Sequence, residues 1–190
     1  VESYQREKIY KGLYDSKEND FIMYSDSDEI PNPHIIQNLD LKKKYAILLQ
    51  KFYVYKINIF NKYESPWEGT RICKKKFLKN FTDLRKNIRS KNLKKAFWNI
   101  KYEKSIDIIN NGGWHFNNIY DAETISKKLK TFQHTEFSKE SYSSVKIIRE
   151  KISNLEDLFG RKHKYQKVEI NEEFPEYIRM NKTYFKNFIA

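Results

Sequence analysis

The predicted fold is decided by residues 20–29, which read Asp20-Phe21-Ile22-Met23-Tyr24-Ser25-Asp26-Ser27-Asp28-Glu29. Four consecutive apolar residues with polar flanks predict a strand that is buried on both faces, as the strands of a parallel sheet are. This strand runs directly into three carboxylates. Ligands of open α/β sheets collect beyond the carboxyl ends of the strands. The stretch therefore predicts an α/β fold with an acidic site at one strand end.

Asp26 and Asp28 are two residues apart, so on a strand they would share a face and converge. Two carboxylates supply the hard oxygen ligands that Mg²⁺ or Mn²⁺ prefers, and such a cation can stabilise a departing diphosphate. The alternative for so short a motif is an acidic turn that caps the next helix. Asn32-Pro33 marks that helix, because it matches an N-cap followed by proline at the first helical position.

Other segments alternate between helical and strand-like patterns. The predicted helices cover residues 3–14, 82–90 and 138–153, and the predicted strands cover residues 45–49, 52–60, 70–73, 96–100 and 168–170. Asn110-Asn111-Gly112-Gly113 predicts a turn, and Asp121 can cap a helix that reaches about residue 129. The sequence contains no repeat or linker, so we expect residues 1–190 to form a single domain.

Aromatic and histidine side chains offer two further candidate sites. Trp114 and His115 follow the double glycine, where an aromatic face could pack on a sugar while a polar group orients its hydroxyls. The alternative is an aromatic core residue beside a hydrogen-bonded histidine. His134 with Glu136 is a second candidate pair, of metal ligand and base.

The chain of 190 residues has a net charge of +12, carried by 30 lysines and only 7 arginines. Because base-reading proteins favour arginine forks, no nucleic-acid function is expected, and a basic surface also suits an anionic nucleotide. The single cysteine, Cys73, excludes an internal disulfide. No apolar run approaches the roughly 18 residues of a membrane span.

Several short blocks occur in an order and spacing typical of one enzyme family. They are Glu2 and Gln5-Arg6 with Ile9 and Gly12-Leu13, Ser25 to Asn32, Trp67-Glu68-Gly69-Thr70, Gly112-Gly113-Trp114-His115-Phe116, Lys128 to Glu136, Asp157-Leu158-Phe159-Gly160-Arg161 and Phe174-Pro175-Glu176-Tyr177. With these blocks the chain resembles the family 17 glycosyltransferases, of the beta-1,4-mannosyl-glycoprotein 4-beta-N-acetylglucosaminyltransferase type, over nearly its whole length.

The resemblance implies a GT-A-like fold, a UDP-N-acetylglucosamine donor, a divalent metal and inverting transfer to a glycan acceptor, as in N-linked glycan biosynthesis. GT-A enzymes begin with strand–helix units that hold the nucleoside, yet this chain reaches its acidic motif by residue 26. We therefore expect it to be the C-terminal part of a longer catalytic domain, incomplete at the N-terminus. The expected compartment is the cytoplasm in a bacterium or virus and the Golgi lumen in a eukaryote.

For the donor side, we expect Asp26 and Asp28 to hold Mn²⁺ or Mg²⁺, with His134 completing the metal site. Arg6 or Arg71, together with Asp26, would contact the donor, since a guanidinium forms charge-assisted forks with phosphate.

For the acceptor side, we expect Trp114 and Trp67 to stack on sugar. Inverting transfer needs a general base near the acceptor hydroxyl. Glu136 is the first candidate, followed by Asp121 and His115. Asn117-Asn118-Ile119 stands where the family has a more aromatic segment, so the acceptor is left open.

Two other classes of function remain as alternatives. A metal-dependent nuclease or nucleotidyltransferase would use the same carboxylates and draw on the positive charge, and its affinity for nucleic acid would depend steeply on salt. A non-catalytic glycan-binding fragment would bind sugar without any effect of metal.

Overall fold

The computed structural model describes residues 2–131 and 140–190, which fall into two compact units. Unit 1 consists of Val1–Gln50 and Trp67–Gly113, and unit 2 of Lys51–Pro66 and Trp114–Ala190. Two long strands, β3 (Tyr45–Val54) and β6 (Ile106–Asn117), contribute residues to both units. The expectation of a single domain stays a prediction.

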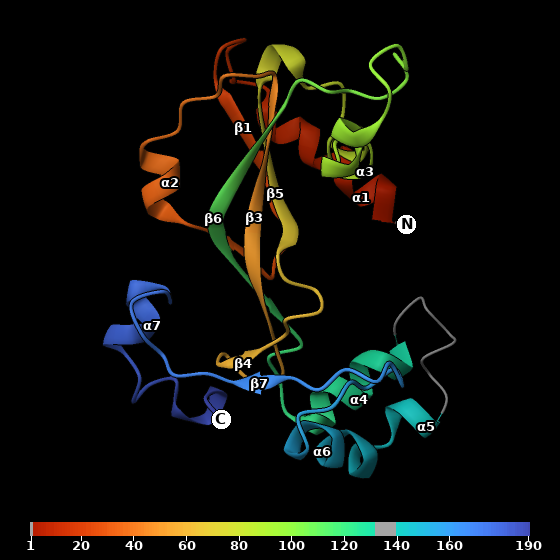
Figure 1. The fold of residues 1–190 in the computed structure, drawn as a ribbon, viewed down its shortest axis with the longest axis vertical. Coiled ribbons are helices and arrows are strands. Elements are labelled where there is room, and N and C mark those ends of the chain that lie inside the picture. Colours follow the sequence, from red (N-terminus) through yellow and green to blue (C-terminus); the bar gives the residue numbers. More distant parts are fainter. Residues whose placement is uncertain (1, 132–139) are drawn as a thin grey trace. The chain divides into compact units, whose positions relative to one another are not determined.

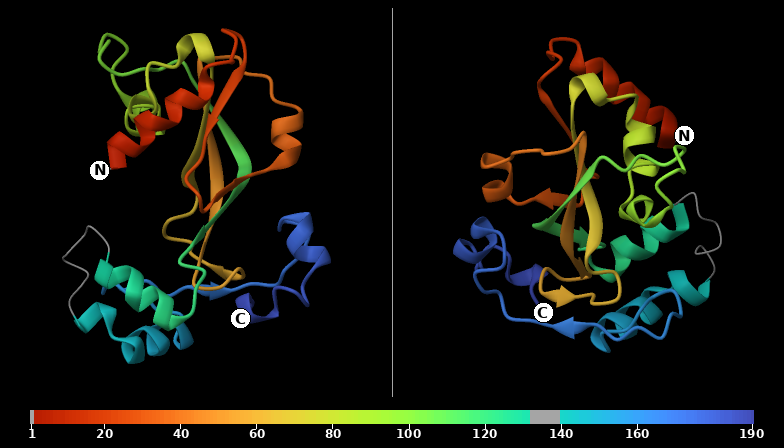
Figure 2. Two further views of the ribbon diagram at one scale, coloured as in Figure 1. Left: turned by 180° about the vertical axis from the view of Figure 1, so that it is seen from behind. Right: turned by 45° about the horizontal axis from the view of Figure 1, so that its top comes forward.

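Unit 1 is a sheet with helices on both faces. Its elements are α1 (Glu2–Ile9), the 3-10 turn η1 (Tyr10–Leu13), β1 (Phe21–Tyr24), β2 (Glu29–Pro31), α2 (Pro33–Gln37), β5 (Trp67–Lys74), η2 (Lys75–Phe77), α3 (Phe81–Lys86) and η3 (Ser90–Lys94), with the first parts of β3 and β6. β5 lies antiparallel to both β1 and β3, and β6 pairs with β3 and β2. β6 runs in the same direction as β3, so the sheet is mixed (Figure 1). Helices α1 and α3 cover one face and α2 covers the other (Figures 1 and 2).

Strand β3 is buried on both faces. Tyr45 and Ile47 belong to the core under α1 and α3, whereas Ala46 and Leu48 belong to the core under α2. Adjacent strand residues point to opposite faces, so an uninterrupted apolar run fills both cores at once. Residues 45–49 therefore anchor both helical layers of unit 1.

The first predicted strand exists, but its environment differs from the prediction. β1 is antiparallel to β5, and its burial alternates, with Ile22 and Tyr24 buried and Phe21 and Met23 exposed. The expectation of burial on both faces is wrong, because β1 has only β5 beside it in the strand order and only one covered face.

The local signals for helix starts are confirmed. The side chain of Asn32 accepts a hydrogen bond from the His34 amide at 3.1 Å, and Pro33 opens α2. In unit 2, Asp121 likewise caps α4 by accepting a hydrogen bond from the Thr124 amide at 2.7 Å. Both caps satisfy amides that have no partner within their own helix.

The predicted turn at residues 110–113 is wrong, because these residues lie inside β6. The two glycines permit close approach of neighbouring backbone. A Cβ on Gly112 would lie 2.5 Å from the Leu48 Cβ, and one on Gly113, whose φ is +137°, would overlap the carbonyl oxygen of Ile30. The glycine pair thus serves strand packing rather than chain reversal.

Four other element predictions also needed correction. Residues 45–54 form one continuous strand instead of breaking near residue 50, and residues 96–100 form turns rather than a strand. The long helix expected over residues 138–153 appears in its described part as α5 (Glu140–Ser143) and α6 (Val145–Ser153). The last strand is β7 (Gln166–Lys167), just before the predicted residues.

Unit 2 has its own aromatic core. Its remaining elements are β4 (Ile59–Phe60), α4 (Ala122–Thr131), α7 (Glu176–Met180) and the 3-10 turn η5 (Lys186–Phe188). The core gathers Tyr53, Ile57, Trp114, Phe174 and Ile178. β4 pairs antiparallel with both β3 and β7.

A buried carboxylate organises the other side of unit 2. Asp157 accepts hydrogen bonds from the Arg161 guanidinium at 2.6 Å and the Tyr165 hydroxyl at 2.9 Å. Burial opposes ionisation here, but these hydrogen bonds outweigh it and hold the pKa of Asp157 below its ordinary value.

The fold class agrees with the prediction at its coarse level, since helices and a mixed sheet are combined. The finer GT-A-like assignment stays a prediction. Among the described helices, none combines the length and the hydrophobicity that crossing a bilayer requires.

Replacing Gly113 with alanine is expected to lower the free energy of unfolding by about 3 kcal/mol, because the new Cβ meets backbone and the positive φ is strained. Urea unfolding followed by circular dichroism measures the change. Gly12→Ala is the control, because nothing lies within 4 Å of the added carbon. Equal stability of the two variants would contradict the close approach at Gly113.

Candidate functional site

The acidic segment after β1 is a closed turn. β1 ends at Tyr24, and the Glu29 amide donates a hydrogen bond to the carbonyl oxygen of Asp26 at 3.0 Å. In return, the Asp26 amide donates to the carboxylate of Glu29 at 3.2 Å. The strand geometry that was expected to align Asp26 with Asp28 is therefore replaced by a turn, which places Asp28 at its apex.

Arg85 on α3 bridges two carboxylates of this turn. Its Nη2 atom lies 2.6 Å from Asp26 Oδ2 and 2.7 Å from Glu29 Oε1. The indole nitrogen of Trp67 donates to the same Glu29 oxygen at 2.8 Å. The side chain of Glu29 is 0% exposed, that of Arg85 11% and that of Asp26 32%. Glu29 is thus an interior charge, whereas Asp26 still reaches solvent.

A tyrosine links the turn to helix α1. The Tyr24 hydroxyl donates to Asp26 Oδ1 at 2.9 Å and accepts from Arg6 Nε at 2.9 Å. Burial is the main reason that the pKa of Tyr24 is raised, so its hydroxyl remains a donor at neutral pH. Arg6 therefore lies one hydrogen-bonded group away from Asp26, and its predicted role in donor binding stays a prediction.

Arg71, the other expected donor-binding residue, is buried on β5 and directs its N–H groups inward. It donates to the carbonyl oxygens of Ile88, Glu68 and Gly69 and to the carboxylate of Glu68. Burial lowers the pKa of Arg71 to about 10, which leaves it charged at neutral pH. Its observed role is to hold the segment after α3 against β5.

Four of the seven arginines take part in this network, either at the turn or around Glu68. They are Arg6, Arg71, Arg85 and Arg89. Sequence reasoning missed Arg85, although a signal was present. In a chain with 30 lysines, an arginine on an amphipathic helix indicates a site where a planar fork is needed.

The carboxylates of the turn offer only a partial set of ligands for a divalent cation. In the part of the chain that the structure describes, no group of three or more His, Cys, Asp or Glu side chains could hold a metal ion. Mg²⁺, however, is commonly bound by one or two carboxylates together with substrate phosphates. Asp26 and Asp28 are the carboxylates of the turn that would hold such a cation, because they keep some exposure to solvent, whereas the side chain of Glu29 is fully buried. The two oxygens of Asp26 also accept hydrogen bonds from Tyr24 and Arg85, so a cation there would share Asp26 with these groups.

Trp114 and His115 lie in unit 2 and are buried there. Trp114 packs in the aromatic core and donates its indole N–H to the carbonyl oxygen of Glu173 at 2.8 Å. His115 stacks on Phe52 with ring centroids 4.4 Å apart. The structure thus gives both residues packing roles, and their predicted roles toward the acceptor stay predictions. Trp67, by contrast, is half-buried beside the acidic turn of unit 1.

Of the three candidates for the general base, the structure describes Asp121 and His115 but not Glu136. Asp121 is the exposed cap of α4, and hydrogen bonds from Thr124 hold the pKa of its carboxylate below the ordinary value. A lowered pKa makes a carboxylate a weaker base. His134 and Glu136 lie outside the described residues.

Comparison of the chain with protein-family models, with curated proteins and with solved structures gives no match in any of the three.

Replacing Arg85 with methionine is expected to lower the free energy of unfolding by about 3–5 kcal/mol, because it leaves Glu29 buried without its cation. Chemical denaturation measures this loss. Combining Arg85→Met with Glu29→Gln should recover roughly 1–3 kcal/mol relative to the sum of the single changes. Arg89→Met is the matched control, because Arg89 forms a more exposed ion pair with Glu68 worth at most about 1 kcal/mol. Additive effects of the first pair would show that Arg85 does not neutralise Glu29.

Proposed function

We propose that the chain is the catalytic core of a metal-dependent, inverting glycosyltransferase, and that the acidic turn of unit 1 holds the diphosphate of a nucleotide-sugar donor. The observation that carries the proposal is the turn itself, in which Asp26 is fixed by Arg85 and Tyr24 yet remains partly exposed. Catalytic electrostatics depends on charges that are already in position before the substrate arrives.

Asp26 and Asp28 are the residues that would hold the cation. When bound there, Mn²⁺ or Mg²⁺ would neutralise the negative charge that develops on the diphosphate as the sugar leaves. Glu29 supports this arrangement from inside, since its carboxylate ties the Asp26 amide, Trp67 and Arg85 together.

Arg85 and Arg6 both supply positive charge to the hydrogen-bond network of Asp26. Arg85 already binds a carboxylate oxygen of Asp26, and the same guanidinium can form charge-assisted hydrogen bonds with phosphate oxygens. Arg6 reaches the turn through the Tyr24 hydroxyl. Their role in the proposal is to orient the diphosphate.

The donor sugar and the acceptor follow from the family resemblance, which implies N-acetylglucosamine from UDP-N-acetylglucosamine and a glycan acceptor. The base that accepts the proton of the acceptor hydroxyl is Glu136 in this proposal. The observed role of Asp121 as a helix cap with a lowered pKa supports placing it behind Glu136.

Replacing Asp28 with asparagine is expected to remove the Mn²⁺-dependent stabilisation of the protein by UDP and to reduce metal-dependent UDP release from UDP-N-acetylglucosamine at least about a hundredfold. Thermal shift and UDP detection measure the two effects. Asp40→Asn is the control, because Asp40 is an exposed carboxylate of the same unit that pairs with Lys42.

An unchanged response to UDP and Mn²⁺ in the Asp28 variant would rule out the metal role of that residue. Metal-dependent cleavage of RNA or DNA by the wild type, lost in the same variant, would instead assign the turn to a nuclease.

Replacing Glu136 with glutamine is expected to lower turnover about 10²–10⁴-fold while donor binding stays unchanged, because only proton transfer is removed. Steady-state kinetics with a glycan acceptor and UDP titration measure the two quantities. Asp121→Asn is the companion variant, since asparagine still caps a helix and turnover should persist. The reverse pattern would move the role of base to Asp121.

A further inference from the structure

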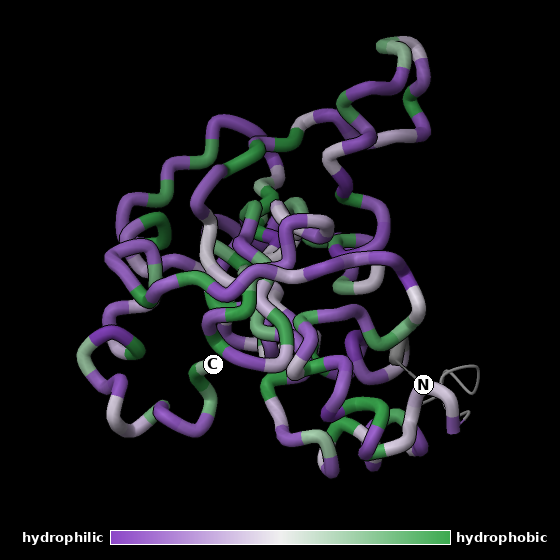
Figure 3. The backbone as a smooth tube through the Cα atoms, turned by 60° about the horizontal axis from the view of Figure 1, so that its bottom comes forward, coloured by the Kyte–Doolittle hydropathy of each residue, from purple (hydrophilic) through white to green (hydrophobic). Residues whose placement is uncertain are grey.

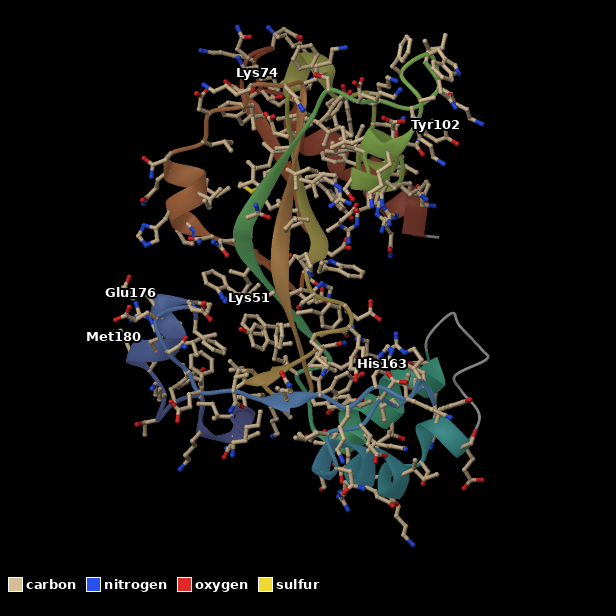
Figure 4. The ribbon with its side chains drawn as sticks, in the orientation of Figure 1. Lys51, Lys74, Tyr102, His163, Glu176 and Met180 are labelled. Atoms are coloured by element: carbon tan, nitrogen blue, oxygen red, sulfur yellow. The ribbon has the colours of Figure 1, made fainter. Side chains whose placement is uncertain are left out.

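A basic, aromatic loop that includes most of η3 projects from unit 1 ahead of β6. This loop, residues 91–104, is the green segment at the upper right of Figure 1, and Tyr102 is labelled on it in Figure 4. It carries three large apolar side chains that are almost fully exposed: Phe97 at 85%, Trp98 at 72% and Ile100 at 96%. Clustered exposed apolar residues on a folded protein usually mark an interaction site.

The loop is built in a defined way. The Asn92 side chain is buried and donates to the carbonyl oxygen of Asn87 at 2.7 Å, which fixes one end, and Ile106 is fully buried at the other. Between these ends, the Asn99 amide donates to the carbonyl oxygen of Ala96 at 3.0 Å, and Lys104 Nζ donates to the same oxygen. The apolar residues are therefore held outward by a hydrogen-bonded scaffold.

Positive charge surrounds the apolar tip. Residues 91–104 contain five lysines and one carboxylate, that of Glu103, which gives a net charge of +4. Glu103 is turned toward the base of the loop, where it accepts hydrogen bonds from the Lys104 and Ser105 amides. Along the tube in Figure 3 the same loop alternates between hydrophobic and hydrophilic colours. The tip thus presents lysines and apolar side chains together.

We propose that this loop docks the protein on the surface of an anionic phospholipid membrane. Trp98 and Phe97 would enter the headgroup region with Ile100 at the acyl boundary, while the lysines contact lipid phosphates. Aromatic and aliphatic side chains ringed by lysine are the chemistry that binds this interface. The inference does not depend on the proposed transferase activity.

Two other occupants fit the loop less well. A second copy of the chain would bring its own net charge of +12 against a loop of net charge +4. A single-stranded nucleic acid would stack on Phe97 and Trp98, but the aliphatic Ile100 gives no stacking surface, and the loop has no arginine.

The test is co-sedimentation of the full chain with phosphatidylcholine vesicles and with vesicles that also contain phosphatidylglycerol. Binding is expected only to the anionic vesicles and should weaken at high salt. Trp98 is the most exposed of the three tryptophans, so its emission should shift to shorter wavelength on binding.

Two loop variants separate the apolar and the charged contributions. Trp98→Ser with Ile100→Ser, and Lys94→Gln with Lys95→Gln and Lys101→Gln, should each weaken partitioning into anionic vesicles at least about tenfold. All five side chains are exposed, so the fold, checked by circular dichroism, should persist.

Matched controls come from unit 2. Met180→Ser with Tyr184→Ser removes exposed apolar surface, and Lys127→Gln with Lys130→Gln and Lys146→Gln removes three exposed charges. Both controls should bind as the wild type does. Three results would overturn the proposal: no binding to either kind of vesicle, retained binding in both loop variants, or loss of RNA binding or of self-association in the loop variants while vesicle binding is unchanged.

Discussion

A carboxylate with no access to solvent, that of Glu29, has to be neutralised inside unit 1, and the guanidinium of Arg85 is its cationic partner. Moving an isolated charge into the protein interior is so unfavourable that the surrounding groups must supply both opposite charge and hydrogen bonds. Trp67, the Asp26 amide and Arg85 do so together. This requirement fixes the acidic turn relative to β5 and α3.

The same network separates the residues that organise the turn from those that face outward. Glu29 and Arg71 form their hydrogen bonds with neighbouring groups inside the protein. Asp26 is held by Tyr24 and Arg85 but keeps part of its surface exposed. Such a division is what a binding site for a charged ligand requires, because a rigid inner layer keeps the outer carboxylate in position without occupying it fully.

Lysine and arginine divide the positive charge of the chain by function. Unit 1 directs arginines toward carboxylates and carbonyl oxygens in its interior, where a planar fork of donors is useful. Lysines dominate the exposed loop of residues 91–104, where a long flexible stem and a hydrated ammonium suit contact with a diffuse anionic surface. The net charge by itself suggests one basic surface. In the structure, arginines neutralise interior carboxylates, whereas lysines form an exposed basic loop.

The sequence by itself determined the features that depend on local rules: the strand before the acidic turn, the caps at Asn32 and Asp121, and the apolar run of β3. Periodicity and capping involve residues within a few positions of each other, so they can be recognised without the fold. The turn predicted from the glycine pair at residues 112–113 was wrong, because these glycines lie in a strand and allow neighbouring strands to approach closely.

Only the tertiary structure decided that Glu29 is buried and that Arg85 neutralises it from 56 positions away. It also decided that Phe97, Trp98 and Ile100 are exposed rather than part of a strand. Burial and charge pairing depend on which distant segments meet, and no local pattern encodes those meetings.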